Sequence, residues 1–163
     1  LDGLGVVRCH LLGFSDGGNI ALLFALKYPQ YVDRLVLNGA NLCPSGVKAS
    51  TQLPIIAGWA VCRVCACFSQ KARRNWELLN LMVTQPHIRP QELAGLAMPV
   101  LVAAGERDMI RESHTRAIAA AIPDSRLAIL PGDHFVARRN WKDFNPLVLA
   151  FLAGGSVQDG QEG

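Results

Sequence analysis

The chain has 163 residues, half of them hydrophobic and 18% charged, with a formal net charge of +3 at pH 7. This length supports one sizeable core and favours one domain over two. The charge is too small, and the basic residues too rarely interleaved with aromatic ones, to predict a nucleic-acid surface. The apolar run at residues 53–68 is interrupted by Pro54, Gly58 and Arg63 and falls short of the roughly 20 residues of a membrane-spanning helix. We therefore expect neither a nucleic-acid nor a membrane partner.

The cysteines give little support to a metal site. Five are present, and three of them, Cys62, Cys65 and Cys67, lie close together. A structural zinc site needs four ligands, and no second Cys or His pair stands at a suitable spacing. Because the three cysteines lie in an apolar run, we expect buried free thiols and no metal. Reduced cysteines favour a cytoplasmic protein.

Predicted strands and helices alternate in the first and last parts of the chain. The expected elements are a helix end at residues 1–5, strand 6–12, helix 19–28, strand 33–39, strand 99–105, helix 111–122, strand 126–130 and a helix from 145 to 154. The last helix is expected to start at Asn145 and Pro146. The alternation predicts an α/β fold with parallel strands joined by right-handed crossovers.

Residues 43–98 break this alternation. Prolines and glycines punctuate helical pieces there, and the best helix candidates are residues 55–68 and 71–84. We expect this segment to be a small helical lid inserted into a core made of residues 1–42 and 99–155. Residues 156–163 are polar and Gly-rich, which predicts a flexible tail.

The residues Gly13-Phe14-Ser15-Asp16-Gly17 match the Gly-x-Ser-x-Gly nucleophile elbow, a sharp turn that exposes a serine between a strand and a helix. The context favours this interpretation, because a predicted strand precedes the motif and a predicted helix follows it. Side chains at Gly13 and Gly17 are expected to collide with neighbouring backbone. A different Gly-rich turn or a phosphate loop is the alternative, but neither Gly-x-Gly-x-x-Gly nor Gly-Lys-Ser/Thr is present.

A serine hydroxyl becomes a strong nucleophile when a histidine removes its proton and a carboxylate orients that histidine. In a parallel sheet, these partners of Ser15 should follow the carboxyl ends of other strands. Asp108 lies three residues beyond the predicted strand end at Gly105, and His134 lies four residues beyond that at Leu130. We predict Ser15 as nucleophile, His134 as general base and Asp108 as the orienting acid.

Other acid and base candidates fit less well. His10 lies within a predicted strand, His87 in the predicted lid and His114 in a predicted helix. Glu106 starts its loop too early to reach far across it. Asp133 adjoins the predicted base in sequence and cannot easily turn to meet its ring.

Together these motifs resemble the α/β-hydrolase superfamily. The stretch from Leu11 to Asn41 carries the elbow, and its Ser-Asp-Gly-Gly form is similar to small serine hydrolases grouped with biphenyl-hydrolase-like enzymes. The residues Gly105-Glu106-Arg107-Asp108 and Gly132-Asp133-His134-Phe135 match the acid and base loops of that family. The resemblance implies the C-terminal part of an α/β-hydrolase fold. It also implies hydrolysis of an ester or related carbonyl bond through an acyl-enzyme, without a metal or organic cofactor.

Further roles follow from this interpretation. The backbone N–H of Asp16 is expected to bind the oxyanion, and Phe14 to shape a pocket for a small ester-like substrate. Trp59 and Trp76 of the predicted lid either line that pocket or pack in the core. Lactone opening, carbon–carbon bond hydrolysis and perhydrolysis use the same triad and stay open.

Part of the family pattern is not matched. Family members carry further strands before the elbow strand and a Gly-rich loop that donates a second oxyanion N–H, and neither precedes Gly13 here. The elbow strand should then be an exposed hydrophobic edge. We expect either a piece of a longer reading frame or a chain that is unstable, poorly active, or self-associating through that edge. The alternative function is a non-catalytic or truncated hydrolase-fold protein that binds a small molecule or a partner.

Overall fold

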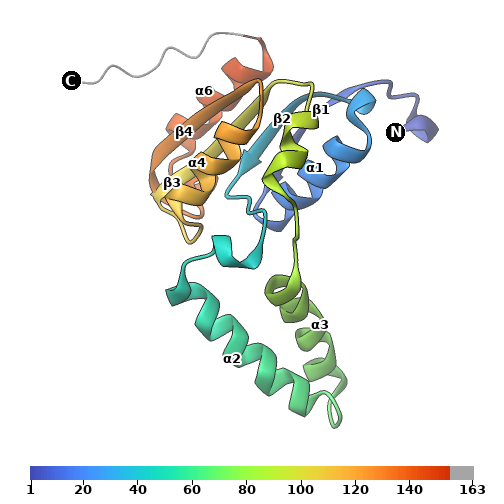
Figure 1. The fold of residues 1–163 in the computed structure, drawn as a ribbon, viewed down its shortest axis with the longest axis vertical. Coiled ribbons are helices and arrows are strands. Elements are labelled where there is room, and N and C mark those ends of the chain that lie inside the picture. Colours follow the sequence, from blue (N-terminus) through green and yellow to red (C-terminus); the bar gives the residue numbers. More distant parts are fainter. Residues whose placement is uncertain (155–163) are drawn as a thin grey trace.

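A single sheet of four parallel strands forms the centre of the molecule, which a computed structural model describes for residues 1–154. The tail expected at residues 156–163 lies outside the described residues. The strands, adjacent in numerical order, are β1 (Cys9–Phe14), β2 (Val32–Asn38), β3 (Val100–Arg107) and β4 (Ser125–Asp133). The α-helices are α1 (Asp16–Lys27), α2 (Ala49–Cys65), α3 (Gln70–Thr84), α4 (Glu112–Ala121), α5 (Val136–Arg139) and α6 (Trp141–Leu152) (Figure 1). The predicted parallel α/β fold is confirmed.

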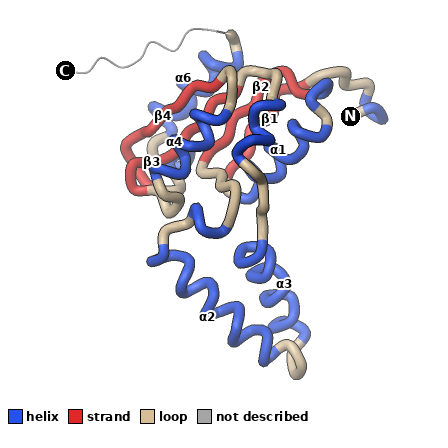
Figure 2. Tube along the Cα trace, in the orientation of Figure 1, coloured by secondary structure: helices blue, strands red, loops and turns tan. Residues whose placement is uncertain are grey.

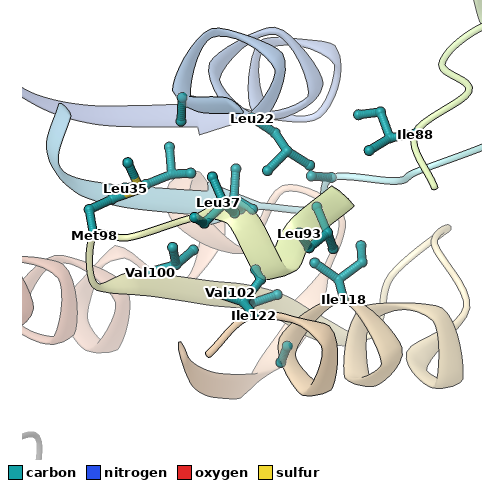
Figure 3. Close-up of a cluster of buried hydrophobic side chains, with 14 of the residues drawn as sticks. Leu22, Leu35, Leu37, Ile88, Leu93, Met98, Val100, Val102, Ile118 and Ile122 are labelled. Carbon is teal, nitrogen blue, oxygen red and sulfur yellow. The ribbon is translucent and has the colours of Figure 1, made fainter. Parts of the chain in front are cut away.

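Helices cover both faces of the sheet, because successive strand residues point to opposite sides. On one face, Leu35 and Leu37 of β2 pack in a cluster with Leu22 of α1 and residues of α4 (Figure 3). On the other face, Val36 packs in a second cluster with Phe151 of α6. Fully burying one such side chain contributes roughly 1.5–3 kcal/mol. The central strand β2 is therefore apolar on both faces, as expected for a parallel sheet between two helix layers.

The carboxyl ends of the strands meet at one edge of the sheet. In the strand register Phe14 is paired with Asn38, Asn38 with Ala103, and Ala103 with Ala128. The loops that leave these ends therefore start close together in space. This edge is where the α/β architecture places a functional site.

Helices α2 and α3 form an antiparallel hairpin that extends away from the sheet (Figures 1 and 2). Neither helix contains a fully buried residue. The two helices contact each other: Leu79 packs close to Gly58, and Trp59 Nε1 donates a hydrogen bond to Asn80 Oδ1 at 3.0 Å. No helix within residues 1–154 is long and apolar enough to cross a membrane.

Two predicted helix starts are wrong in the same way. Helices α2 and α6 begin at Ala49 and Trp141, five residues before Pro54 and Pro146, which lie inside them. Each proline is the sixth residue of its helix, so it removes one i→i−4 backbone hydrogen bond and leaves the first turn in place. In α6 the buried side chain of Phe144 holds the turn before the proline against the core.

Strand β1 is an edge of the sheet in the described part of the chain, as the sequence predicts. Its burial alternates, and Leu12 is 50% exposed, whereas Val36 in the neighbouring strand is fully buried. A free strand edge with exposed apolar side chains favours pairing with another strand. Self-association through this edge stays a prediction.

Candidate active site

The elbow at Ser15 joins β1 to α1 without an intervening loop. Ser15 has φ 54° and ψ −124°, a backbone conformation with positive φ that residues other than glycine rarely adopt. Such a residue stores roughly 1–3 kcal/mol of strain that its surroundings must hold. Its N–H donates to Asn38 O at 2.8 Å, and its carbonyl accepts from Gly18 N at 2.8 Å and Asn19 N at 3.2 Å. These bonds fix the serine at the carboxyl edge of the sheet.

The glycines of the elbow differ in how much space a side chain would have. A Cβ at Gly13 would lie 2.5 Å from Gly18 Cα, so this position allows no side chain. The prediction of a collision at Gly17 is wrong, because nothing lies within 4 Å of a Cβ built there. The close approach falls instead on Gly18, whose Cβ would lie 3.0 Å from Ala40 Cβ and 3.2 Å from Gly13 O.

The structure brings together the three residues predicted as a triad. His134 Nε2 lies 3.0 Å from Ser15 Oγ, and His134 Nδ1 lies 2.7 Å from Asp108 Oδ1. With the ring hydrogen on Nδ1, the imidazole donates to the carboxylate and accepts from the serine hydroxyl. His134 and Asp108 are 5% and 2% exposed, so water does not weaken their interaction much. The carboxylate also accepts from Ile110 N at 2.9 Å, which fixes its orientation.

The competing acids do not reach the imidazole. Glu106 is exposed. Asp133 is held by other groups, since its Oδ2 pairs with Arg139 and its Oδ1 accepts from Phe135 N at 3.0 Å. Asp108 is therefore the carboxylate placed to orient the histidine.

The other histidines lie away from Ser15. His10 is on β1, where its Nδ1 lies 3.5 Å from Asp33 Oδ2, and His87 is exposed. His114 of α4 accepts a hydrogen bond from Leu42 N at Nε2, at 3.0 Å. Burial lowers the pKa of His114, which keeps that nitrogen free to accept.

Aromatic rings surround the histidine. The ring of Phe14 lies 4.9 Å from that of His134, and the ring of Phe135 lies 5.7 Å from it. Phe14 is 37% exposed, so it presents apolar surface beside Ser15. Asp16 is the first residue of α1, where an N–H has no partner within the helix and the helix dipole favours negative charge.

Sequence reasoning missed three residues near the triad. Gly39, directly after β2, has φ +64°, and a Cβ there would lie 2.8 Å from the ring of His134. Lys48 and Arg107 line a cavity of about 380 Å³ together with Asp108 and His134. The position of Arg107 next to Asp108 was a usable signal, whereas the approach of Gly39 and Lys48 depends on tertiary packing.

The cysteines are less buried than the sequence predicts. The described residues contain no group of His, Cys, Asp and Glu side chains able to hold a metal ion. All five cysteines are free, but the expected burial is wrong: Cys65 and Cys67 are exposed and Cys62 is half-buried. The reason is that α2 belongs to the hairpin and does not pack into the sheet core.

Comparisons with known proteins agree with this geometry. A family model described as the alpha/beta hydrolase fold matches residues 1–88. The human serine hydrolase BPHL is 29% identical over 164 aligned positions, which cover 89% of this chain and 55% of the relative. The 2-hydroxy-6-oxo-6-phenylhexa-2,4-dienoate hydrolase of Burkholderia cepacia is 26% identical, covering 95% of this chain and 66% of the enzyme.

Solved structures show the same fold. A hydrolase from Pseudomonas aeruginosa PA01 matches with a TM-score of 0.69 and 26% identity, covering 93% of this chain and 67% of that one. The meta-cleavage product hydrolase of Pseudomonas fluorescens IP01 matches with a TM-score of 0.71 and 20% identity, covering 94% and 67%. This chain spans little more than half the length of human BPHL. The family match and the shared fold establish that the chain belongs to the α/β-hydrolase fold family.

Proposed function

We propose that this chain carries the catalytic triad of a serine hydrolase that cleaves an ester or a related carbonyl bond. The observation that supports this most directly is the hydrogen-bond chain from Ser15 through His134 to Asp108, which joins three loops at one sheet edge. The kinship with proteins named as serine and dienoate hydrolases supports the same reaction class.

In the proposed reaction, Ser15 Oγ attacks the carbonyl carbon while its proton moves to His134 Nε2. The tetrahedral intermediate then collapses, the bond to the leaving group breaks, and His134 returns the proton to that group. A water molecule, deprotonated by His134, then attacks the acyl carbon. The bond from that carbon to Ser15 Oγ breaks, His134 returns the proton to Oγ, and the acid is released. Asp108 accepts a hydrogen bond from the Nδ1–H group throughout and stabilises the imidazolium.

The oxyanion is proposed to bind at the backbone N–H of Asp16. Its place at the start of α1 supports this role, because an unpaired N–H and the positive end of the helix both favour negative charge. Losing one oxyanion donor raises the barrier by about 3–4 kcal/mol in enzymes of this kind. Phe14, beside the histidine, is proposed to form part of an apolar substrate surface.

We propose the hairpin of α2 and α3 as the lid, within the segment 43–98 predicted from sequence. The hairpin leaves from the edge of the sheet that carries Ser15 and has no buried residue of its own (Figure 1). The last part of the segment, unlike the hairpin, is buried: Ile88, Leu93 and Met98 pack in the hydrophobic core beside the sheet. The lid in this proposal is therefore shorter than the predicted insertion.

The test is hydrolysis of 4-nitrophenyl butyrate by the 163-residue chain and by Ser15→Ala. Losing the nucleophile of a triad lowers the rate by about 10⁴-fold or more. Ser45→Ala, at an exposed serine outside the triad, serves as the matched control and should keep the wild-type rate. Hydrolysis that survives in Ser15→Ala, or ester binding without turnover in the folded chain, would contradict the proposal and favour a binding role.

A further inference from the structure

A cavity of about 380 Å³ lies beside the histidine of the triad, between the loops that carry Asp108 and His134 and the start of α2. The polar residues that line it are Lys48, Ser50, Thr51, Arg107, Asp108, Asp133 and His134. The cavity is therefore shared between the triad and the beginning of the proposed lid. A group bound in it would lie beside the imidazole of His134.

The charges of this cavity are unbalanced. Among residues 1–154, the side chains of Lys48 and Arg107 make no hydrogen bond or ion pair. The carboxylate of Asp108 accepts a hydrogen bond from the imidazole of His134, and the carboxylate of Asp133 forms an ion pair with Arg139. Counted with Arg139, three cationic side chains meet two carboxylates, which leaves an excess of one positive charge at this space. An anion entering it gains attraction without displacing an existing ion pair.

The remaining lining groups suit an oxygen anion. The hydroxyls of Ser50 and Thr51 are hydrogen-bond donors, and Lys48 and Arg107 provide charge-assisted donors. The first turn of α2 contains no acidic residue, so the positive end of the helix adds to the same potential. A carboxylate fits better than a phosphate dianion, because the carboxylates of Asp108 and Asp133 border the same space and repel a second negative charge.

We propose that this cavity binds the carboxylate of the substrate, so that the chain prefers esters that carry a free acid group. This inference rests on the proposed serine-hydrolase function and adds a substrate class to it. His134 connects the two sites, since it lines the cavity and its Nε2 lies 3.0 Å from Ser15 Oγ. The scissile carbonyl at Ser15 and the carboxylate between Lys48 and Arg107 then lie on either side of the imidazole.

The test compares two matched series of esters. One contains mono-4-nitrophenyl esters of linear diacids from glutaric to suberic acid, and the other replaces the free carboxylate by a neutral isopropyl group of similar shape. The measured quantity is the ratio of kcat/KM for the acid ester to that for its neutral counterpart. We expect this ratio to exceed one for at least one chain length, and to fall about tenfold in Lys48→Met and in Arg107→Met. Lys71→Met, on the exposed surface of α3, is the control and should keep the wild-type ratio.

The outcomes separate the subsite from the reaction. Hydrolysis that requires Ser15 but shows no acid preference, or a preference unchanged in Lys48→Met and Arg107→Met, overturns the subsite and leaves the proposed function standing. If neither series is hydrolysed, the proposed function fails, and binding of adipate is measured by NMR titration. Adipate binding that is lost in the double variant supports the anion site. Adipate binding that is absent, or equal in wild type and double variant, overturns it.

Discussion

Gly39 offers a way to disturb the triad without removing any of its chemical groups. It follows β2 directly, has φ +64°, and donates its N–H to Ala103 O at 3.0 Å. A Cβ at this position would lie 2.8 Å from His134 Cε1, 2.9 Å from Nδ1 and 3.3 Å from Asp108 Oδ2. We therefore predict that Gly39→Ala impairs the reaction through the position of the imidazole.

The expected magnitude has two parts. The left-handed backbone conformation costs a non-glycine residue about 1–2 kcal/mol of stability. Carbon atoms in contact prefer separations of about 3.5–4 Å, so the ring of His134 must move by close to 1 Å to accept the new methyl group. A displacement of that size lowers the rate of an enzyme by about 10²-fold. Activity should thus fall far more than a loss of stability alone explains.

The assay measures the rate of fluorophosphonate labelling together with urea unfolding for Gly39→Ala and for Gly5→Ala. Gly5 is the matched control, because its φ is +66° and nothing lies within 4 Å of a Cβ built there. Gly5→Ala should share the backbone strain and keep the wild-type labelling rate. If Gly39→Ala labels at the wild-type rate, or if both folded variants lose the same fraction of activity, then a Cβ at Gly39 does not act by displacing the imidazole of His134.

Three further predictions follow from other contacts. Asp108→Asn should lower the esterase rate by about 10⁴-fold with little change in far-UV circular dichroism, because the histidine loses its orienting carboxylate; a rate within tenfold of wild type would argue against this role. Gly105→Ala should destabilise the chain by about 1–3 kcal/mol in urea unfolding, since its Cβ would collide with the backbone carbonyls of Gly132 and Asp133. Gly95→Ala, with open space around it, should change little. Burial lowers the pKa of His114 in the folded chain below the ordinary histidine value of about 6.5. As the pH falls below that value, the unfolded chain binds the proton first, so the stability that neutral His114 contributes is lost as the pH approaches the lower pKa of the folded chain. His114→Gln, which cannot titrate, should therefore show a weaker loss of urea stability between pH 7.5 and pH 5, and an unchanged pH profile would contradict this.

The order of elements and the grouping of the triad were accessible from sequence because they depend on local patterns. Apolar strands followed by turns mark the carboxyl ends of a parallel sheet, and those ends meet whatever the details of packing. Ser15, Asp108 and His134 each follow such an end within a few residues. Their convergence could therefore be predicted without knowledge of any tertiary distance.

What could not be predicted depends on contacts between distant segments. The motif places glycines at Gly13 and Gly17, but only the packing of α1 against Ala40 makes Gly18 the tighter position. The apolar run around Cys65 has the composition of a buried helix, yet it lies in a hairpin that leaves the core, so its thiols are exposed. The loop after β2 brings Lys48 to the triad only because the chain turns there toward the end of β3, where Lys48 N donates to Met109 O at 2.8 Å.

We expect Ser15, His134 and Asp108 to form a working nucleophile in this chain. The most direct test is to label the 163-residue protein with a fluorophosphonate probe and to locate the adduct by peptide mass spectrometry, in wild type and in His134→Ala. We expect modification of Ser15 alone, and loss of that modification when the imidazole is removed. A folded chain that is not modified, or a Ser15 that is modified equally in His134→Ala, would contradict this expectation.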